Sequence, residues 1–290
     1  MHYIKLMRPH HYVKNGLLFL PLIFSGQFAV NKTLLSLLMC VASFCLLSSV
    51  VYVVNDIKDV EADKQHPRKK NRPIASGEIT IAQAVIYAGV LLISSAALLF
   101  FAGVPPLSWL IWGAYLVINA GYSVFGLKHI ALLDIALLVS GFLLRVLFGS
   151  VVTGIAISDW LYLTVIAISF YLALGKRRNE LKLKEAGKSE TRKVLRGYSF
   201  SFLDKNMYVC LGEAIVFYSL WSVDGATKLI HANSGAIWTV PLIILISMRY
   251  SSNIEGDSEG DPTDVILKDK VLLSLVGLYM VAMFFIIYGI

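Results

Sequence analysis

Residues 34–63 read LLSLLMCVASFCLLSSVVYVVNDIKDVEAD, an apolar run that passes directly into an acidic cluster. Residues 34–54 carry no charge and are long enough to cross a bilayer, which takes about 20 predominantly apolar residues. The cluster holds Asp56, Asp59 and Asp63 at positions i, i+3 and i+7. If the helix continues, all three carboxylates project from one of its faces. The stretch predicts a transmembrane helix with a group of carboxylates where it leaves the membrane.

Three anions on one face of a helix repel each other unless a cation lies among them. Mg²⁺ is the candidate that fits, because it takes oxygen ligands, usually one or two carboxylates together with substrate phosphates. We therefore predict a magnesium site formed by Asp56, Asp59 and Asp63. A phosphorylated substrate follows from the same argument.

The composition of the whole chain is that of a membrane protein. Of its 290 residues 57% are apolar and only 16% are charged, and the mean hydropathy of +0.70 excludes an ordinary soluble domain. Nine apolar runs approach the length of a span. They cover residues 13–30, 34–54, 81–101, 107–124, 131–152, 160–174, 205–221, 234–248 and 272–290. The sequence therefore predicts an all-α, polytopic protein with nine transmembrane helices.

Basic residues are segregated between alternate loops of this arrangement. The stretch up to residue 14 and the gaps 55–80, 125–130, 175–205 and 249–271 hold 23 of the 26 Lys and Arg residues. The opposite loops hold only Lys32 and Lys228. The positive-inside rule then puts the N-terminus and the basic loops in the cytoplasm and the C-terminus outside. We expect a multi-pass protein of the inner (plasma) membrane, without a removable signal peptide.

No soluble domain can be separated from the spans. We predict one integral-membrane domain, residues 1–290, with an active site facing the cytoplasm and covered by the loops 55–80, 175–205 and 249–271. The three cysteines lie in apolar runs without a C-x-x-C spacing, and an odd number cannot all pair. We interpret them as small buried apolar residues.

Basic side chains near the acidic cluster are candidates for binding phosphate. Guanidinium groups suit phosphate oxygens and ammonium groups supply point charges, although contact with anionic lipid is the alternative for any basic loop. The position directly after the carboxylates favours phosphate for Arg68, Lys70 and Arg72. Further candidates at the same membrane face, which snorkelling or interface anchoring would also explain, are Lys14, Tyr122, Lys128, Lys176 and Arg177.

Arg145 is a charge inside a predicted span. Such a charge costs several kcal/mol unless it faces a partner or a polar cavity. Asp134, almost three whole turns earlier in the same span, and Glu213, which we expect to be buried in the seventh span, are potential partners. A salt bridge within the bundle and a role in a polar substrate chamber are both open for Arg145. On the second interpretation Arg145 is a further candidate for binding substrate phosphate.

Three motifs together resemble the UbiA superfamily of intramembrane prenyltransferases. They are Arg8-Pro9 with Val13-Lys14-Asn15, the pattern Asn-Asp-x-x-Asp-x-x-x-Asp at 55–63, and Arg-Pro-Ile-Ala-Ser-Gly at 72–77. The resemblance spans essentially the whole chain. It implies an all-helical nine-span bundle, Mg²⁺ on the first acidic motif, and an isoprenoid in a lateral tunnel open to lipid.

The second acidic motif of that family, Asp-x-x-x-Asp after the sixth span, is replaced here by Gly-Lys-Arg-Arg-Asn-Glu at 175–180. In this respect the chain resembles one branch of the superfamily. The enzymes of that branch transfer the phosphoribosyl group of phosphoribosyl diphosphate (PRPP) to a long-chain, decaprenyl-type polyprenyl phosphate. Diphosphate is released, and the product feeds the synthesis of a lipid-linked arabinose donor for the cell envelope.

The resemblance also implies roles for individual residues. Mg²⁺ on Asp56, Asp59 and Asp63 would hold the diphosphate of PRPP, with Asn55 orienting the ligands. The phosphate charges would be balanced by Lys14, Arg68, Lys70, Arg72, Lys128, Lys176 and Arg177. The partners expected are PRPP, polyprenyl phosphate and the lipid bilayer, and no nucleic acid; the oligomeric state is open, a homo-oligomer included. The alternatives are a prenyltransferase acting on an aromatic acceptor and, from another class, an anion transporter.

Overall fold

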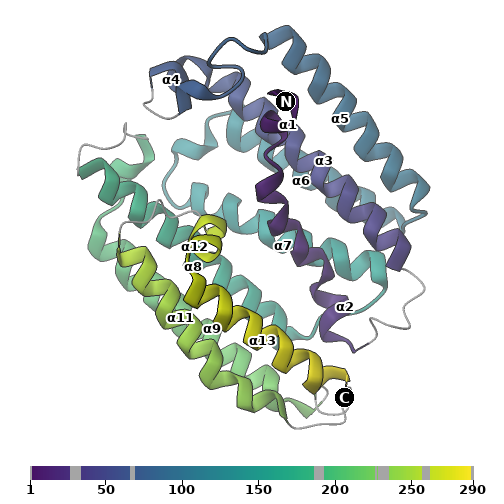
Figure 1. The fold of residues 1–290 in the computed structure, drawn as a ribbon, viewed down its shortest axis with the longest axis vertical. Helices are drawn as coiled ribbons and strands as arrows, with labels where there is room; N and C mark the ends of the chain where they lie inside the picture. Colours follow the sequence, from purple (N-terminus) through teal and green to yellow (C-terminus); the bar gives the residue numbers. More distant parts are fainter. Residues whose placement is uncertain are drawn as a thin grey trace. The chain divides into compact units, whose positions relative to one another are not determined.

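Helices form all the regular structure in the ranges that the computed structural model describes, which are residues 2–26, 34–65, 69–185, 193–225, 227, 235–256 and 262–288. No strand occurs within these ranges, so the all-α prediction is confirmed. The chain divides into two compact units, Met1–Pro21 with Val30–Ile155, and Leu22–Ala29 with Ala156–Ile290. Each unit is described by itself (Figure 1), and the single integral-membrane domain stays a prediction.

The first unit contains the N-terminal elements and four long helices. Its elements are α1 His2–Met7, η1 Pro9–Phe19, α3 Leu34–Lys58, α4 Val60–Gln65, η2 Lys69–Asn71, α5 Ile81–Phe101, α6 Pro106–Val124, η3 Leu127–His129 and α7 Leu133–Thr153. The short helix α2, Leu20–Phe24, follows η1 where the chain passes from one unit to the other.

Seven of the described helices are long and apolar enough to cross a membrane, and two of the nine predicted spans are not among them. The first, 13–30, begins as the 3₁₀ helix η1, and Pro21, which has no N–H to donate, lies in the first turn of α2. The seventh corresponds to α9, which carries Asp204, Lys205 and Glu213. A multi-span membrane protein is supported, whereas the count of nine and the cytoplasmic N-terminus stay predictions.

Polar side chains join the apolar helices of the first unit. Ser43 in α3 donates to the backbone oxygen of Ser95 in α5 at 2.7 Å, and Ser95 donates back to the oxygen of Ser43 at 2.8 Å. Trp112 in α6 donates to the hydroxyl of Ser95 at 3.0 Å. Small hydroxyl residues let helix backbones approach closely and satisfy one another in an apolar environment. These bonds hold α3, α5 and α6 together beneath the acidic cluster.

The second unit consists of α8 Asp159–Glu185, η4 Lys193–Gly197, α9 Phe200–Val223, η5 Gly235–Thr239, α11 Val240–Glu255, α12 Pro262–Lys268 and α13 Lys270–Tyr288. α8 passes close to α11 at Gly175, where a Cβ would lie 2.9 Å from Ile254. Lys182 in α8 donates to the backbone oxygens of Glu255, the last residue of α11, and of Gly256, which follows it, at 2.8 and 2.7 Å. The charged end of α8 is thereby tied to the end of α11.

Asp269 joins α11 to α13 and gives a prediction for stability. Its Oδ1 accepts from the backbone N–H groups of Val271 and Leu272, and its Oδ2 accepts from Asn253 at 2.6 Å and Arg249 at 2.7 Å. These hydrogen bonds hold the pKa of Asp269 well below its usual range, and the bond from Asn253 has the largest effect. Because the folded pKa is depressed, the contribution to stability is present above the ordinary carboxyl pKa and is lost only as the pH falls through the folded value.

We expect Asp269→Ala to lower the Tm of the detergent-solubilised protein by about 2–4 °C at pH 7, because it removes the cap of α13. The difference between wild type and variant should stay constant from pH 8 to pH 5. Thermal unfolding followed by circular dichroism measures it. A difference that disappears between pH 8 and pH 6 would contradict the depressed pKa.

Candidate active site

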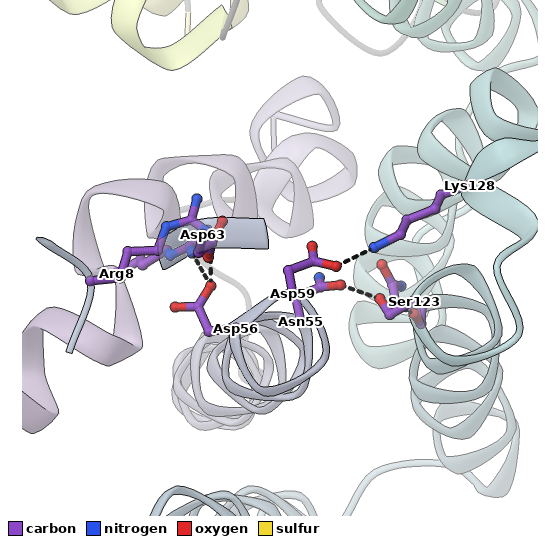
Figure 2. Close-up of polar contacts among 9 residues, drawn as sticks. Arg8, Asn55, Asp56, Asp59, Asp63, Ser123 and Lys128 are labelled. Carbon is purple, nitrogen blue, oxygen red and sulfur yellow. Dashed lines mark hydrogen bonds and ion pairs between the residues drawn. The ribbon is translucent and has the colours of Figure 1, made fainter. Parts of the chain in front are cut away.

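The acidic cluster begins on the last turn of α3 and ends in α4. The helical hydrogen bonds continue across the junction, since Asp59 N–H donates to the oxygen of Asn55 at 2.9 Å and Asp63 N–H donates to the oxygen of Asp59 at 2.8 Å. α3 itself ends at Lys58. Figure 2 shows that Asp56 and Asp63 meet on one side, whereas Asp59 points toward another part of the fold. The single face predicted for the three carboxylates is therefore divided in two.

Two guanidinium groups cover the carboxylates of Asp56 and Asp63. Arg72 Nη1 donates to Oδ1 of Asp56 at 3.1 Å and to Oδ2 of Asp63 at 2.5 Å, so that one group bridges both acids. Arg8 donates from Nη2 to the same oxygen of Asp56 (Figure 2). Each of these two aspartates is only 3% exposed. Buried charges of this kind need hydrogen-bonded partners of opposite sign, and the two arginines supply them.

The other side of the cluster is tied to the end of α6 and to η3. Lys128 Nζ donates to Oδ1 of Asp59 at 2.6 Å. Ser123 donates its hydroxyl to the amide oxygen of Asn55, and also to the backbone oxygen of Asn119 at 3.0 Å. The side chains of Asn55 and Asp59 are therefore fixed in direction by groups far along the chain from them (Figure 2).

Arg72 is positioned by the short segment around it. Its N–H donates to the oxygen of Lys69 at 2.9 Å, which closes η2. The following Ile74 and Ile79 are buried in a core with Leu6 of α1. Gly77, at φ +81°, supplies the left-handed turn between the two isoleucines. The basic loop is thus packed on the unit through apolar side chains, and Arg72 faces inward to the acids.

Arg8 is positioned by an uncommon backbone conformation. Its φ of 54° and ψ of 61° lie in the left-handed region, which costs a residue with a Cβ about 1–2 kcal/mol. Its guanidinium carbon lies 5.2 Å from the centre of the Tyr52 ring, within cation–π range. Burial lowers the pKa of Arg8, and the nearby Asp56 opposes that shift. Arginine still keeps its charge at neutral pH, so Arg8 is a fixed cation on Asp56.

The oxygen donors of this cluster fit magnesium in kind. Mg²⁺ binds through one or two carboxylates plus phosphate oxygens, and the hydrogen bonds described for Asp56, Asp59 and Asp63 fall on one oxygen of each. Among the residues that the structure describes, no group of three or more His, Cys, Asp or Glu side chains is arranged to hold a metal. The acids are arranged around arginine and lysine, so the three-aspartate magnesium site stays a prediction.

Comparison with known protein families assigns the chain to one of them. A model of the UbiA prenyltransferase family matches residues 18–182, which is more than half of the chain and includes the whole acidic cluster. This chain belongs to the UbiA prenyltransferase family. The resemblance inferred from its motifs is thereby confirmed.

Relatives in this family share nearly the full length of the chain. The decaprenyl-phosphate phosphoribosyltransferase of Corynebacterium glutamicum is 34% identical over 97% of this chain and 85% of that protein. That of Mycolicibacterium smegmatis is 34% identical over 97% of this chain and 92% of that protein. A solved UbiA homologue from Archaeoglobus fulgidus, bound to GPP and Mg²⁺, has a TM-score of 0.73 over the whole of both chains at 18% identity. At that identity the structure shows the shared UbiA fold alone.

Arg145 does not form the salt bridge that its sequence position suggested. Its hydrogen bonds go to neutral groups from η1, α3, α6 and α7. Asp134 is buried at the start of α7, but Glu213 is exposed on α9, contrary to our expectation. Asp134 and Arg145, although eleven residues apart in one helix, are too far apart along its axis for a direct contact, because each residue adds about 1.5 Å.

Other predicted phosphate-binding residues of the first unit differ in exposure. Lys14 on η1 and Tyr122 on α6 are half-buried, and Tyr122 is next to Ser123 of the site. Lys70 is exposed on η2. Arg68 lies outside the described residues. The structure brings Arg72 and Lys128 to the acids, and the phosphate-binding role of each remains a prediction.

The predicted residues of the second unit lie on α8. Arg177 is completely buried and donates to Glu180, one turn later, at 2.6 Å. Lys176 is half-buried beside it. Arg178, which we did not single out, pairs with Asp204 of α9. The basic motif at 175–180 therefore takes part in ion pairs within its own unit, and a role in binding phosphate stays a prediction.

The roles of two residues of the site are not identified by sequence reasoning. Arg8 belongs to one of the three motifs but has no predicted role in the site. Ser123, beside Tyr122 at the end of the fourth predicted span, is given only a place that could line the pocket or mark the membrane interface. The signal that could have found Arg8 is its place before Pro9, in a motif of the UbiA family that precedes the acidic one. For Ser123 the sequence does not identify the partner, because Asn55 lies on another helix.

Proposed function

We propose that this UbiA family member transfers the 5-phosphoribosyl group of PRPP to a polyprenyl phosphate and releases diphosphate. The proposal is supported by relatives that carry this activity in their names and are 34% identical over nearly the whole chain. The observation that carries it is Arg72, which bridges Asp56 and Asp63, with Arg8 on the same carboxylate. Carboxylates for a metal and guanidinium groups for phosphate are thereby joined in one cluster.

The transfer is a substitution at C1 of the ribose. The bond from C1 to the diphosphate oxygen breaks, and the electron pair leaves with diphosphate. A bond forms from C1 to an oxygen of the polyprenyl phosphate, which is already an anion, so no general base is needed. The carbon gains oxocarbenium character on the way, and electrostatic stabilisation and positioning supply most of the catalysis.

Each residue of the cluster has a role in this proposal. Arg8 and Arg72 pass from the carboxylates to diphosphate oxygens, which suit the fork geometry of guanidinium. Asp56, Asp59 and Asp63 then offer oxygen ligands to Mg²⁺, with Asn55 oriented by Ser123. The metal ion, when bound, supplies charge neutralisation that makes diphosphate a better leaving group. Further phosphate contacts are assigned to the basic residues Lys14, Arg68, Lys70, Lys128, Lys176 and Arg177.

We assign this site to the cytoplasmic face of the plasma membrane, where PRPP is available, because the positive-inside rule applied to the predicted spans puts the basic loops on that side. The isoprenoid chain of the acceptor remains in the bilayer. The product is a lipid-linked phosphoribose, the precursor of a lipid-linked arabinose donor.

The proposal is tested in membranes that contain the expressed protein, with PRPP and polyprenyl phosphate as substrates. We expect a radiolabelled lipid product that requires Mg²⁺. EDTA should lower the rate at least about a hundredfold, because a bound metal ion stabilises the charge that develops in the transition state by several kcal/mol. Re-addition of Mg²⁺ should restore the rate. Product formed only from a prenyl diphosphate and an aromatic acid would contradict the proposal, as would anion uptake without turnover.

A further inference from the structure

Arg145 is a buried cation at the centre of the first unit. It is 6% exposed, and its guanidinium carbon lies 4.8 Å from the centre of the Tyr115 ring. Its hydrogen bonds run from Nε to Asn15 Oδ1 at 2.7 Å, from Nη1 to the oxygen of Gly141 at 2.6 Å, and from Nη2 to Tyr115 at 2.8 Å and Ser48 at 3.4 Å. One side chain of α7 thereby links η1, α3 and α6.

None of these acceptors carries a charge, so burial of the Arg145 cation is not offset by an ion pair with any of them. A charged side chain inside a membrane helix costs several kcal/mol, and cation–π contacts to Tyr115 and Phe44 offset only part of it. All three guanidinium nitrogens of Arg145 already donate to protein groups, and the side chain is buried among these partners. This geometry suits a residue that holds other elements in place better than one that binds a phosphate directly.

The element that Arg145 holds is unusual. η1 continues as a 3₁₀ helix for 11 residues, although runs longer than about three or four residues are uncommon. One turn beyond Arg145, at Gly149, α7 touches η1 again, and a Cβ there would lie 2.0 Å from the backbone oxygen of Leu18. Arg145 and Gly149 therefore form one contact face of α7 that receives Asn15 and Leu18.

The 3₁₀ winding determines how far η1 reaches. Arg8 lies seven residues before Asn15, which is about 14 Å in a 3₁₀ helix but about 10.5 Å in an α-helix. On α3, which runs antiparallel to η1, Asp56 lies eight residues after Ser48, or about 12 Å. The two elements also meet between these levels, where the hydroxyls of Tyr12 and Ser49 are 2.7 Å apart. With Asn15 and Ser48 both bonded to Arg145, the backbone of Arg8 lies within about 2 Å of the level of Asp56 along α3, which the arginine side chain spans.

We propose that Arg145 is a positioning residue for the diphosphate site, which acts through Asn15 and η1 on Arg8. The inference rests on the proposed phosphoribosyl transfer and adds a residue to it. It replaces the direct phosphate contact that the sequence suggested for Arg145. Loss of the Arg145 side chain should weaken the binding of PRPP, because Arg8 is then displaced. The binding of polyprenyl phosphate should be unchanged.

A double-mutant cycle between Arg145 and Arg8 tests the pathway. We expect Arg145→Gln and Arg8→Gln each to raise the KM for PRPP about tenfold, and the double variant to remain near tenfold instead of reaching about a hundredfold. Arg145→Lys should behave like Arg145→Gln, because one ammonium cannot span the same partners. Arg249→Gln, in the second unit, is the matched control and should combine independently with Arg145→Gln. The proposal is overturned if the two single effects multiply, so that the KM for PRPP of the Arg145→Gln, Arg8→Gln double variant rises about a hundredfold. A raised KM for polyprenyl phosphate in Arg145→Gln overturns it as well.

A covalent replacement for the Arg145 bond provides a second test. The amide nitrogen of Asn15 lies 3.2 Å from the sulfur of Cys45, which is a free thiol on α3. In the Arg145→Gln background, Asn15→Cys is oxidised with Cys45, and in protein in which the disulfide has formed the KM for PRPP should return toward the wild-type value. Reduction should raise it again, and addition of Cys45→Ser should prevent the rescue. A raised KM in protein whose disulfide is verified by mass spectrometry overturns the proposal.

Wild-type turnover in the same assay separates this inference from the proposed function. If wild type forms no product from PRPP, the proposed function fails, and the dissociation constant of diphosphate, measured by calorimetry on the same variants, then tests Arg145. An unchanged diphosphate affinity in Arg145→Gln, in protein that purifies as a single species, overturns the positioning role.

Discussion

We expect Asp56→Asn to lower kcat/KM for phosphoribosyl transfer about a thousandfold or more, because the change affects both the metal and the cationic groups of the site. Asp56 is buried and receives two guanidinium groups on one oxygen. The amide removes the charge that Arg8 and Arg72 share, and it is a poor ligand for Mg²⁺. Initial rates with varied PRPP, on protein purified in detergent, measure the effect, and size-exclusion chromatography checks the fold.

Asp59→Asn is the matched control for this prediction. The carboxylate of Asp59 is 37% exposed and has Lys128 as its partner, so an amide in its place stays solvated. We expect its loss of activity to be smaller than that of Asp56→Asn, although the sequence alone places both residues in the same magnesium site. Wild-type activity in a folded Asp56→Asn protein would exclude this carboxylate as a metal ligand, and equal losses in the two variants would contradict the division of the cluster.

What the sequence predicts correctly depends on residues that are close along the chain. The acidic motif and the basic loop are separated by a few residues, so their spacing alone indicates that Arg72 lies near Asp56 and Asp63. Length and apolarity are enough to predict the seven described helices that could cross a membrane. Such features follow from local chain geometry and from the membrane as a solvent.

Features that depend on distant residues could not be predicted in this way. Asn15 and Arg145 are far apart in the sequence, and only the packing of η1 against α7 brings them together. Lys128 approaches Asp59 for the same reason, across the gap between α3 and η3. The sequence offers Asp134 and Glu213 as partners of Arg145 because opposite charge is the only visible criterion. Neutral acceptors leave no such signature.

The apolar pattern of the sequence also does not predict that η1 is a 3₁₀ helix. Residues 13–30 have the apolar content of an ordinary span, so the length criterion predicts one. The contact with Gly149 shows how closely η1 packs here: the backbone of Leu18 lies directly against α7, with no room for a side chain between them. Close backbone approach of this kind depends on a glycine that the sequence gives no reason to single out.

Gly149→Ala should therefore be among the most damaging single-methyl changes in the chain. A Cβ at this position would lie 2.0 Å from the backbone oxygen of Leu18, and neither backbone can move without separating η1 from α7. Overpacking costs about 1–3 kcal/mol or more, so we expect the Tm to fall by about 5–10 °C. Because η1 carries Arg8, the KM for PRPP should rise in the protein that remains folded.

Gly113→Ala, in the middle of α6, is the control that separates this clash from a general effect of replacing glycine. A Cβ at Gly113 meets nothing within 4 Å, and alanine is favoured over glycine in a helix by about 1 kcal/mol. We expect the Tm of this variant to be unchanged or slightly raised, with an unchanged KM for PRPP. Thermal unfolding and initial rates on the two variants, side by side, measure both effects. A Gly149→Ala protein as stable and as active as Gly113→Ala would show that η1 does not need its close contact with α7 to place Arg8.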